Sequence, residues 1–170
     1  MQGVEVAWFS DTFLFYSNDA TQSSFTHVEG VSRRFIQVLT QREIPARGSL
    51  SHGEFLANKS NQIFVGPALV DAHHYGERYN WIGFVLCRSA VQKLPERRLM
   101  QHYANWKTEF KIKTSQNTME TKSEDVWAYK MGAGGRQNPC IQSLRRMADR
   151  TTDNDHRQKY ENSLQFLERC

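Results

Sequence analysis

The sequence contains no apolar run that approaches the roughly 20 residues of a membrane-spanning helix. Its first nine residues are neither basic nor long enough for a secretory signal, and no repeat or low-complexity segment follows them. A length of 170 residues, with 39% hydrophobic and 24% charged residues, is typical of one ordinary globular domain. We therefore expect a single cytoplasmic domain over residues 1–170, without a membrane partner.

Closely spaced cysteines are also missing. The three cysteines, Cys87, Cys140 and Cys170, are widely separated and form no CxxC pair. Their odd number and their spacing suit a reducing compartment, so we interpret them as structural thiols, with Cys170 a tail residue. A domain of this length buries roughly two-thirds of the surface that its unfolded chain exposes, and it therefore needs no disulfide to fold.

A continuous basic stripe with interleaved aromatic residues is absent as well. The formal net charge of +4 favours anionic partners, nucleotides among them. The basic residues are dispersed, however, and short groups such as Arg97-Arg98 and Arg145-Arg146 are typical of solvated helix faces. Charge is the one feature that favours a nucleic-acid-binding domain, and we do not expect nucleic acid as a partner.

Hydrophobic periodicity indicates mixed secondary structure. Phe25, Val28, Val31, Phe35 and Leu39 recur at steps of three and four residues, which predicts an amphipathic helix that ends near residue 43. The other patterns predict strands over 4–9, 12–16, 46–56, 63–65, 81–87, 110–114 and 126–131, a helix after residue 66, and two closing helices. The order of these elements predicts an α+β fold, with a core over 1–90 followed by antiparallel strands and C-terminal helices over 91–170.

Two segments resemble motifs of a known family. They are RGSLSHGE at residues 47–54 and IFVGPALVDA at residues 63–72. Class III nucleotide cyclases carry an R-x-G-I-x-x-G strand, followed by an aromatic-x-G turn and a helix that begins G-x-x-V-N-x-A. Both motifs occur here in approximate form and in the same order, after one hairpin and one helix. Over residues 4–89, about half its length, the chain therefore resembles the catalytic domain of class III nucleotide cyclases.

The resemblance is greatest to bacterial branches, because Gly66-Pro67-Ala68 is followed by Ala72 and Glu77, and Trp81 opens the next strand. Those branches include the pyrimidine cyclases of antiphage signalling systems. The resemblance implies a ferredoxin-like cyclase fold and the conversion of a nucleoside triphosphate into a 3′,5′-cyclic nucleotide and pyrophosphate. It also implies two divalent cations, Mg²⁺ or Mn²⁺, which activate the ribose 3′-oxygen and neutralise the triphosphate. Because class III sites form between two protomers, it further implies a homodimer.

Four residues of this chain correspond to functional positions of the family. The resemblance implies that Asp11, in the pair Ser10-Asp11 at the hairpin turn, binds metal. It implies that Arg47 contacts phosphate, and that Gly53 and Gly66 allow close backbone approach. Each residue also has a plainer interpretation. Aspartate favours turns through Asx hydrogen bonds, arginine is common at solvated strand ends, and glycine is common in turns. The neighbouring histidines do not predict a zinc site, because adjacent helical side chains point about 100° apart.

Other family positions do not match. Val70 and His74 occupy the positions of the asparagine and arginine that support the transition state, and valine cannot donate a hydrogen bond. Ala7 and Ile63 occupy the purine-reading positions, which leaves a pyrimidine substrate, or no base at all, as alternatives. These mismatches favour an alternative function, namely a non-catalytic cyclase-like module that binds a nucleotide or a protein.

The first strand of the family, which carries the other metal aspartate, has no counterpart here. Only residues 1–3 precede the predicted hairpin. In cyclases that strand lies centrally in the sheet, so its absence would leave unpaired backbone groups in the core. We expect either that the native product starts upstream of Met1 or that the fold has rearranged. We do not expect these 170 residues alone to be catalytically active, because one metal carboxylate is missing.

Overall fold

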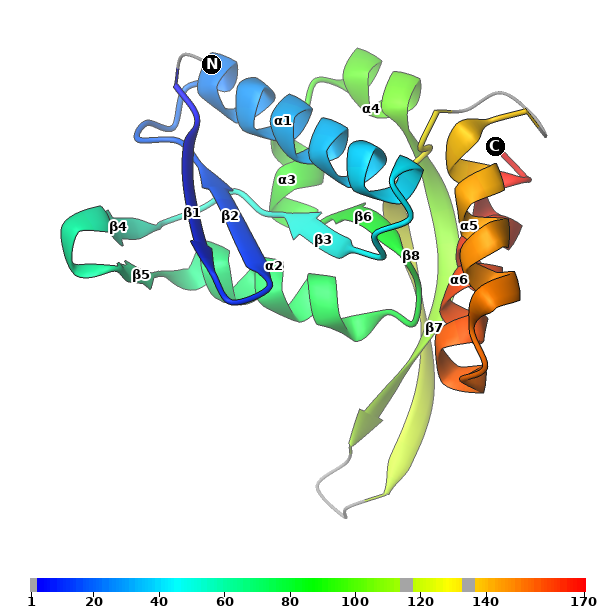
Figure 1. The fold of residues 1–170 in the computed structure, drawn as a ribbon. Coiled ribbons are helices and arrows are strands. Elements are labelled where there is room, and N and C mark those ends of the chain that lie inside the picture. The colour runs from blue at the N-terminus through cyan, green and yellow to red at the C-terminus, as the bar shows by residue number, and fades with distance from the viewer. Residues whose placement is uncertain (1–2, 114–117, 133–136) are drawn as a thin grey trace.

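The computed structural model of the chain describes residues 3–113, 118–132 and 137–170. The strands are β1 (Glu5–Phe9), β2 (Thr12–Tyr16), β3 (Arg47–Leu50), β4 (Leu56–Asn58), β5 (Ile63–Val65), β6 (Gly83–Leu86), β7 (Tyr103–Lys113) and β8 (Met119–Tyr129). The helices are α1 (Gln22–Gln41), α2 (Pro67–Arg78), α3 (Arg88–Lys93), α4 (Glu96–His102), α5 (Pro139–Arg150) and α6 (Asn154–Leu167), with one 3-10 turn over Lys59–Asn61. The predicted α+β class is therefore confirmed (Figure 1).

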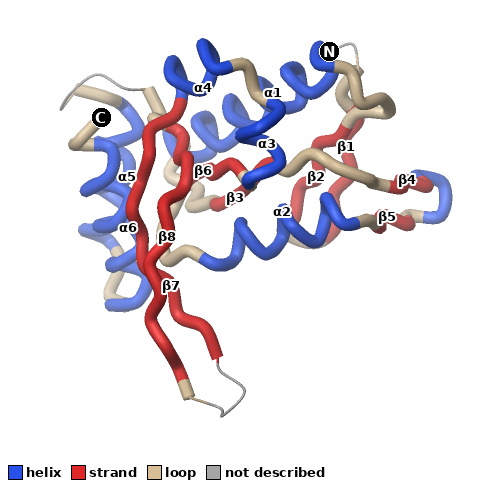
Figure 2. Tube along the Cα trace, turned by 180° about the vertical axis from the view of Figure 1, so that it is seen from behind, coloured by secondary structure: helices blue, strands red, loops and turns tan. Residues whose placement is uncertain are grey.

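The strands form one larger sheet and two separate hairpins. The larger sheet has the order β3-β6-β8-β7, in which β3 and β6 are parallel and the other neighbours are antiparallel. β1 pairs with β2, and β4 pairs with β5, each in a sheet of its own. Both hairpins lie at the side of the molecule opposite α5 and α6, and the β7–β8 hairpin extends away from the body (Figures 1 and 2).

Helices α1 and α2 cover opposite faces of the sheet at β3. A Cβ atom at Gly48 would lie 3.6 Å from Cδ1 of Ile36 in α1, so this position faces α1. The next residue, Ser49, donates a hydrogen bond from its hydroxyl to the carbonyl oxygen of Ala72 in α2. Because successive strand residues point to opposite faces, β3 lies between the two helices. α1 lies above β3 and α2 below it in both views (Figures 1 and 2).

Local sequence explains where several helices begin. Thr21 caps α1, since its hydroxyl accepts a hydrogen bond from the backbone N–H of Ser24 at 3.2 Å. Asn138 and Asp153 cap α5 and α6 in the same way. Pro67 occupies the first turn of α2, where its missing N–H group costs little.

The hydrophobic core draws on both halves of the chain. Trp81, which precedes β6, packs against Trp106 of β7 with ring centroids 4.4 Å apart, and against Phe166 of α6 at 5.7 Å. Cys87 and Cys140 are buried free thiols in this interior, whereas Cys170 is exposed. Within the described residues, no helix combines the length and the apolar character that crossing a bilayer requires.

Several sequence-based boundaries were wrong. The predicted strand over 46–56 is two strands, β3 and β4, that belong to different sheets. Residues 88–93 and 96–102, which the sequence patterns left unassigned, form α3 and α4. The predicted strands over 110–114 and 126–131 overlap the longer β7 and β8, and β8 ends at Tyr129. Thr114 lies outside the described residues.

The ferredoxin-like cyclase arrangement remains a prediction. Within the described residues, no strand joins β2 to β3, so the β1–β2 hairpin stays outside the four-stranded sheet. α1 nevertheless packs on both β2 and β3.

Candidate functional site

The hairpin turn carries the first sequence-predicted site residue. Phe9 pairs with Thr12, which leaves Ser10 and Asp11 as a two-residue turn, and Ser10 adopts a φ of 56°. The side chain of Asp11 is exposed, and no other described residue forms a hydrogen bond or an ion pair with it. The structure therefore confirms that Asp11 lies at a turn and leaves its carboxylate available to a ligand.

A metal centre is not evident around this carboxylate. In the parts of the chain that the structure describes, no group of three or more histidine, cysteine, aspartate or glutamate side chains is placed to hold a metal ion. A site for two divalent cations needs several oxygen ligands. The described residues therefore do not fit the pair of metal ions that the cyclase resemblance implies, and Asp11 contributes one isolated carboxylate.

Arg47 lies at the start of β3 and already has an anionic partner. Its guanidinium contacts the carboxylate of Glu77 in the last turn of α2 and lies 3.4 Å from the carbonyl oxygen of the same residue. The two side chains are 31% and 53% exposed, so solvent screens the pair. A phosphate group at Arg47 would compete with Glu77 for the guanidinium.

The two predicted backbone-approach glycines have different surroundings. Gly66 adopts a φ of +146°, and a Cβ atom there would lie 2.5 Å from the carbonyl oxygen of Glu54 and 2.9 Å from Cα of Phe55. The close approach at Gly66 is therefore made by the backbone of residues 54–55. A Cβ atom at Gly53 would meet only Cβ of Ala68, at an ordinary 3.6 Å.

The mismatched family positions are also placed by the structure. Val70 and His74 are exposed on α2, and Val70 is 52% exposed. Ile63 is exposed on β5, whereas Ala7 is buried in β1. Whether these positions take part in nucleotide recognition remains a prediction.

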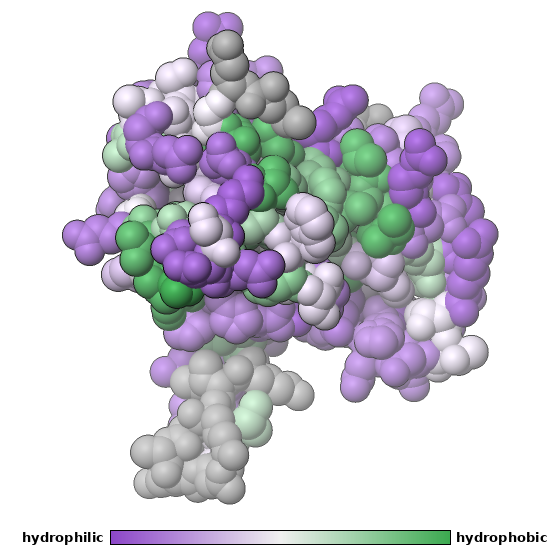
Figure 3. Space-filling view, turned by 60° about the vertical axis from the view of Figure 1, so that its left-hand side comes forward, coloured by the Kyte–Doolittle hydropathy of each residue, from purple (hydrophilic) through white to green (hydrophobic). Residues whose placement is uncertain are grey.

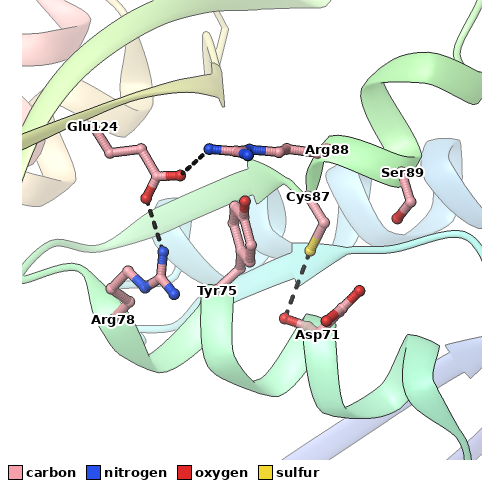
Figure 4. A pocket seen from close by; sticks show the side chains of 7 residues that line it. All are labelled: Asp71, Tyr75, Arg78, Cys87, Arg88, Ser89 and Glu124. Carbon is pink, nitrogen blue, oxygen red and sulfur yellow. Dashed lines mark hydrogen bonds and ion pairs between the residues drawn. The ribbon is translucent and has the colours of Figure 1, made fainter.

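A pocket that the sequence motifs did not identify lies beside helix α2 (Figure 4). It has a volume of about 370 Å³ and lies between α2, the junction of β6 with α3, and β8. Its lining residues are Asp71, Tyr75, Arg78, Cys87, Arg88, Ser89 and Glu124. Asp71, Tyr75 and Arg78 are spaced by four and three residues, which places them on one face of α2. This spacing is visible in the sequence and could have indicated that the three side chains lie together. Glu124 is distant in sequence, and no local pattern indicated it.

Glu124 organises one end of this pocket. One of its carboxylate oxygens accepts hydrogen bonds from Arg78 at 2.8 Å and from the hydroxyl of Tyr79 at 3.0 Å. The other oxygen lies 3.6 Å from the guanidinium of Arg88, which is beyond hydrogen-bonding distance. The side chain of Glu124 is 15% exposed and that of Arg88 is 85% exposed. Arg78 therefore neutralises Glu124, and Arg88 remains largely available.

Cys87 at the base of the pocket is not a nucleophile. Burial raises the pKa of its thiol to about 12, and the nearby charge of Asp71 adds to the rise. Because the thiolate is the reactive form, a thiol with this pKa stays protonated and unreactive near neutral pH. Its sulfur donates instead to the carbonyl oxygen of Asp71 at 3.7 Å.

A second surface feature lies on the two hairpins. Seven of the eleven exposed large hydrophobic residues that the structure describes lie on β1–β2, β4–β5 and the first turn of α2. We call them the hairpin surface: Trp8, Phe9, Phe13, Leu56, Ile63, Val65 and Val70. Figure 3 brings this side of the molecule forward and shows hydrophobic patches there among hydrophilic side chains.

Aromatic contacts hold the two hairpins together. Phe64 of β5 lies 6.4 Å from Phe9 of β1 and 6.0 Å from Tyr16 of β2, between ring centroids. On the other side of the hairpin, Phe13 packs against Phe35 of α1 at 5.0 Å. The hairpin surface is therefore attached to the body through defined ring contacts.

No protein-family model, curated protein or solved structure matches this chain.

Proposed function

We propose that these residues form a non-catalytic binding module, in which the hairpin surface contacts a protein partner. The observation that carries the proposal is the concentration of exposed apolar side chains on that surface, from Trp8 at 70% exposure to Phe9 and Ile63 at 47%. Exposed large apolar side chains that gather on one side of a protein mark candidate interaction sites. The mismatches at Val70 and His74 and the lack of a metal-ligand cluster among the described residues support a role without catalysis.

The partner that we favour is a second copy of the chain. The cyclase resemblance implies a homodimer, and a two-fold contact would bring the same apolar residues together from both copies. Trp8 and Phe9 have the residue type that dominates interface energetics, because aromatic side chains bury a large area at a small entropic cost.

Substitution of one exposed residue on this surface should therefore weaken self-association. We expect Leu56→Glu to weaken the dimer by roughly tenfold or more, because it places a charge inside an apolar contact. Met100→Glu is the matched control, since Leu56 and Met100 are 61% and 57% exposed and only Leu56 belongs to the hairpin surface. Sedimentation equilibrium over a range of concentrations would measure both. A wild-type chain that stays monomeric at all concentrations would reject the second copy as partner.

Nucleotide cyclisation is a second candidate, which the placement of Asp11 favours. In this reaction the ribose 3′-oxygen bonds to the α-phosphorus, pyrophosphate leaves, and the 3′-hydroxyl proton is released. Asp11 has an exposed carboxylate without a partner among the described residues, at the turn of a hairpin that precedes α1 and the Arg47 strand. This placement supports the candidate. Ala7 and Ile63 make a pyrimidine the base that we favour for such a substrate.

This candidate predicts a product and a residue that it depends on. The chain would be incubated with each of the four nucleoside triphosphates and Mn²⁺, and products would be identified by mass. If cyclic nucleotide forms, Asp11→Asn should lower its formation by orders of magnitude and barely move the melting temperature, because exposed substitutions change stability by only a few tenths of a kcal/mol, roughly. Arg47→Ala should reduce nucleotide affinity in the same assay. Absence of product from these 170 residues alone is expected under both candidates, so the decisive sample is a longer product that supplies the missing metal carboxylate. Absence of product from that sample with every nucleotide would reject this candidate.

A further inference from the structure

The pocket beside α2 presents one cation and one anion that are largely available to a ligand. Arg78 and Glu124 neutralise each other through a hydrogen bond of 2.8 Å. Arg88 has only the contact of 3.6 Å to Glu124, and the carboxylate of Asp71 has no hydrogen bond or ion pair with any other described residue. Figure 4 shows Asp71 on α2 and Arg88 on the opposite wall. A ligand would therefore meet a cation on one side and an anion on the other.

The base of the pocket adds no further charge. Burial, followed by the charge of Glu124, raises the pKa of Tyr75, so its phenol stays neutral at physiological pH. The thiol of Cys87 stays neutral as well, with its pKa raised to about 12. Ser89 contributes a hydroxyl whose oxygen accepts a hydrogen bond from the backbone N–H of His52 at 3.0 Å, which leaves its own proton free to donate.

We propose that this pocket binds a small zwitterion, a free amino acid or a close analogue, through Arg88 and Asp71. Arg88 contacts the carboxylate, because the guanidinium fork matches carboxylate geometry with two parallel hydrogen bonds. Asp71 accepts hydrogen bonds from the ammonium group. A volume of about 370 Å³ lies in the range of small-molecule sites and leaves room for a side chain. A phosphate dianion fits less well, since Arg88 is the one largely available cation that faces it among the lining residues and Asp71 repels it.

The proposal is tested by calorimetric titration of the purified chain with unmodified and capped amino acids. L-Alanine, L-lysine and L-glutamate probe the preferred side chain. N-acetyl-L-alanine lacks the ammonium charge and L-alaninamide lacks the carboxylate. We expect saturable binding of at least one unmodified amino acid, and a loss of roughly tenfold or more in affinity when either charged group is capped. Uridine monophosphate and inorganic phosphate serve as the anionic alternatives.

Two variants connect binding to the named residues. Asp71→Asn keeps the side-chain size and removes the negative charge, and Arg88→Gln removes the guanidinium charge. Each should weaken binding roughly tenfold or more. Arg97→Gln is the control, because Arg97 is an exposed arginine of α4 outside the pocket, and it should bind as wild type does. Thermal melts verify that each variant is folded. Equal affinity for capped and free ligands, no saturable binding of any amino acid, or phosphate binding that ignores Asp71→Asn would overturn the proposal.

Discussion

Replacing Glu29 by glutamine should lower the free energy of unfolding by about 3–5 kcal/mol, the cost of removing one partner from a buried ion pair. Glu29 lies in α1 with no exposed surface. Its carboxylate accepts hydrogen bonds from Arg33 at 2.8 Å, from Arg98 of α4 at 2.8 Å and from the hydroxyl of Tyr103 in β7 at 2.7 Å. A neutral amide would leave two partly buried guanidinium groups without an anion.

A matched control for this variant exists at the surface. Glu43 also contacts two arginines, Arg146 and Arg150, but its side chain is 23% exposed and those of its partners are 46% and 70% exposed. Glu43→Gln should therefore change stability little, because solvent screens exposed ion pairs. Equilibrium denaturation in urea at neutral pH would measure both variants. Equal effects for Glu29 and Glu43 would show that burial does not set the strength of the Glu29 network.

The Glu29 network also predicts the dependence of stability on pH. Burial by itself raises the pKa of Glu29. Hydrogen bonds from Arg98 and Tyr103 and the charge of Arg33 together lower the pKa by more than burial raises it, so the folded pKa lies below the ordinary value of 4.5. A carboxyl group with a lowered folded pKa stabilises the protein fully above its unfolded pKa. That contribution should disappear as the pH falls from 4.5 through the folded pKa. The stability difference between wild type and Glu29→Gln should shrink over the same range.

Gly66→Ala should lower the free energy of unfolding by roughly 2–5 kcal/mol, because it combines backbone strain with overpacking. The φ of +146° at Gly66 is one that residues with a Cβ rarely adopt. The added Cβ would also meet backbone atoms at 2.5 Å and 2.9 Å, and backbone cannot rotate away as a side chain can. The start of α2 would have to move away from residues 54–55.

Gly53→Ala provides the comparison, because a Cβ at Gly53 meets only Cβ of Ala68 at 3.6 Å. Its melting temperature should stay close to that of the wild type, whereas Gly66→Ala should melt several degrees lower. Equal melting temperatures for the two variants would mean that the segments at Gly66 can separate at little cost.

The sequence predicted elements well where local signals determine them. The hairpin of β1 and β2 with its turn, the helix opened by Gly66 and Pro67, and the two closing helices were all predicted. Each depends on residues within one element, such as alternating side chains or a proline in a first helical turn. β3 and β4 were merged because their break over residues 51–55 contains no proline, and its glycine, Gly53, was interpreted as part of one strand.

The candidate sites were less accessible to sequence reasoning, since they depend on residues far apart in the chain. Glu124 reaches Arg78 across 46 positions, and Arg47 reaches Glu77 across 30. The family motif predicted that Arg47 contacts phosphate, but only the tertiary structure could show that Glu77 contacts the same guanidinium. The hairpin surface was missed for a related reason, because alternating apolar residues such as Phe13 and Val65 are equally typical of buried strands.

The separation of both hairpins from the four-stranded sheet affects how the molecule opens. β1 and β2 share backbone hydrogen bonds only with each other among the described strands, and so do β4 and β5. Two-stranded hairpins are only marginally stable by themselves, so ring contacts such as Phe9–Phe64 and Phe13–Phe35 must supply much of their stability. We therefore expect the two hairpins to open together, before the interior around Trp81 does. A partner bound at the hairpin surface would oppose this local unfolding and leave the interior unaffected.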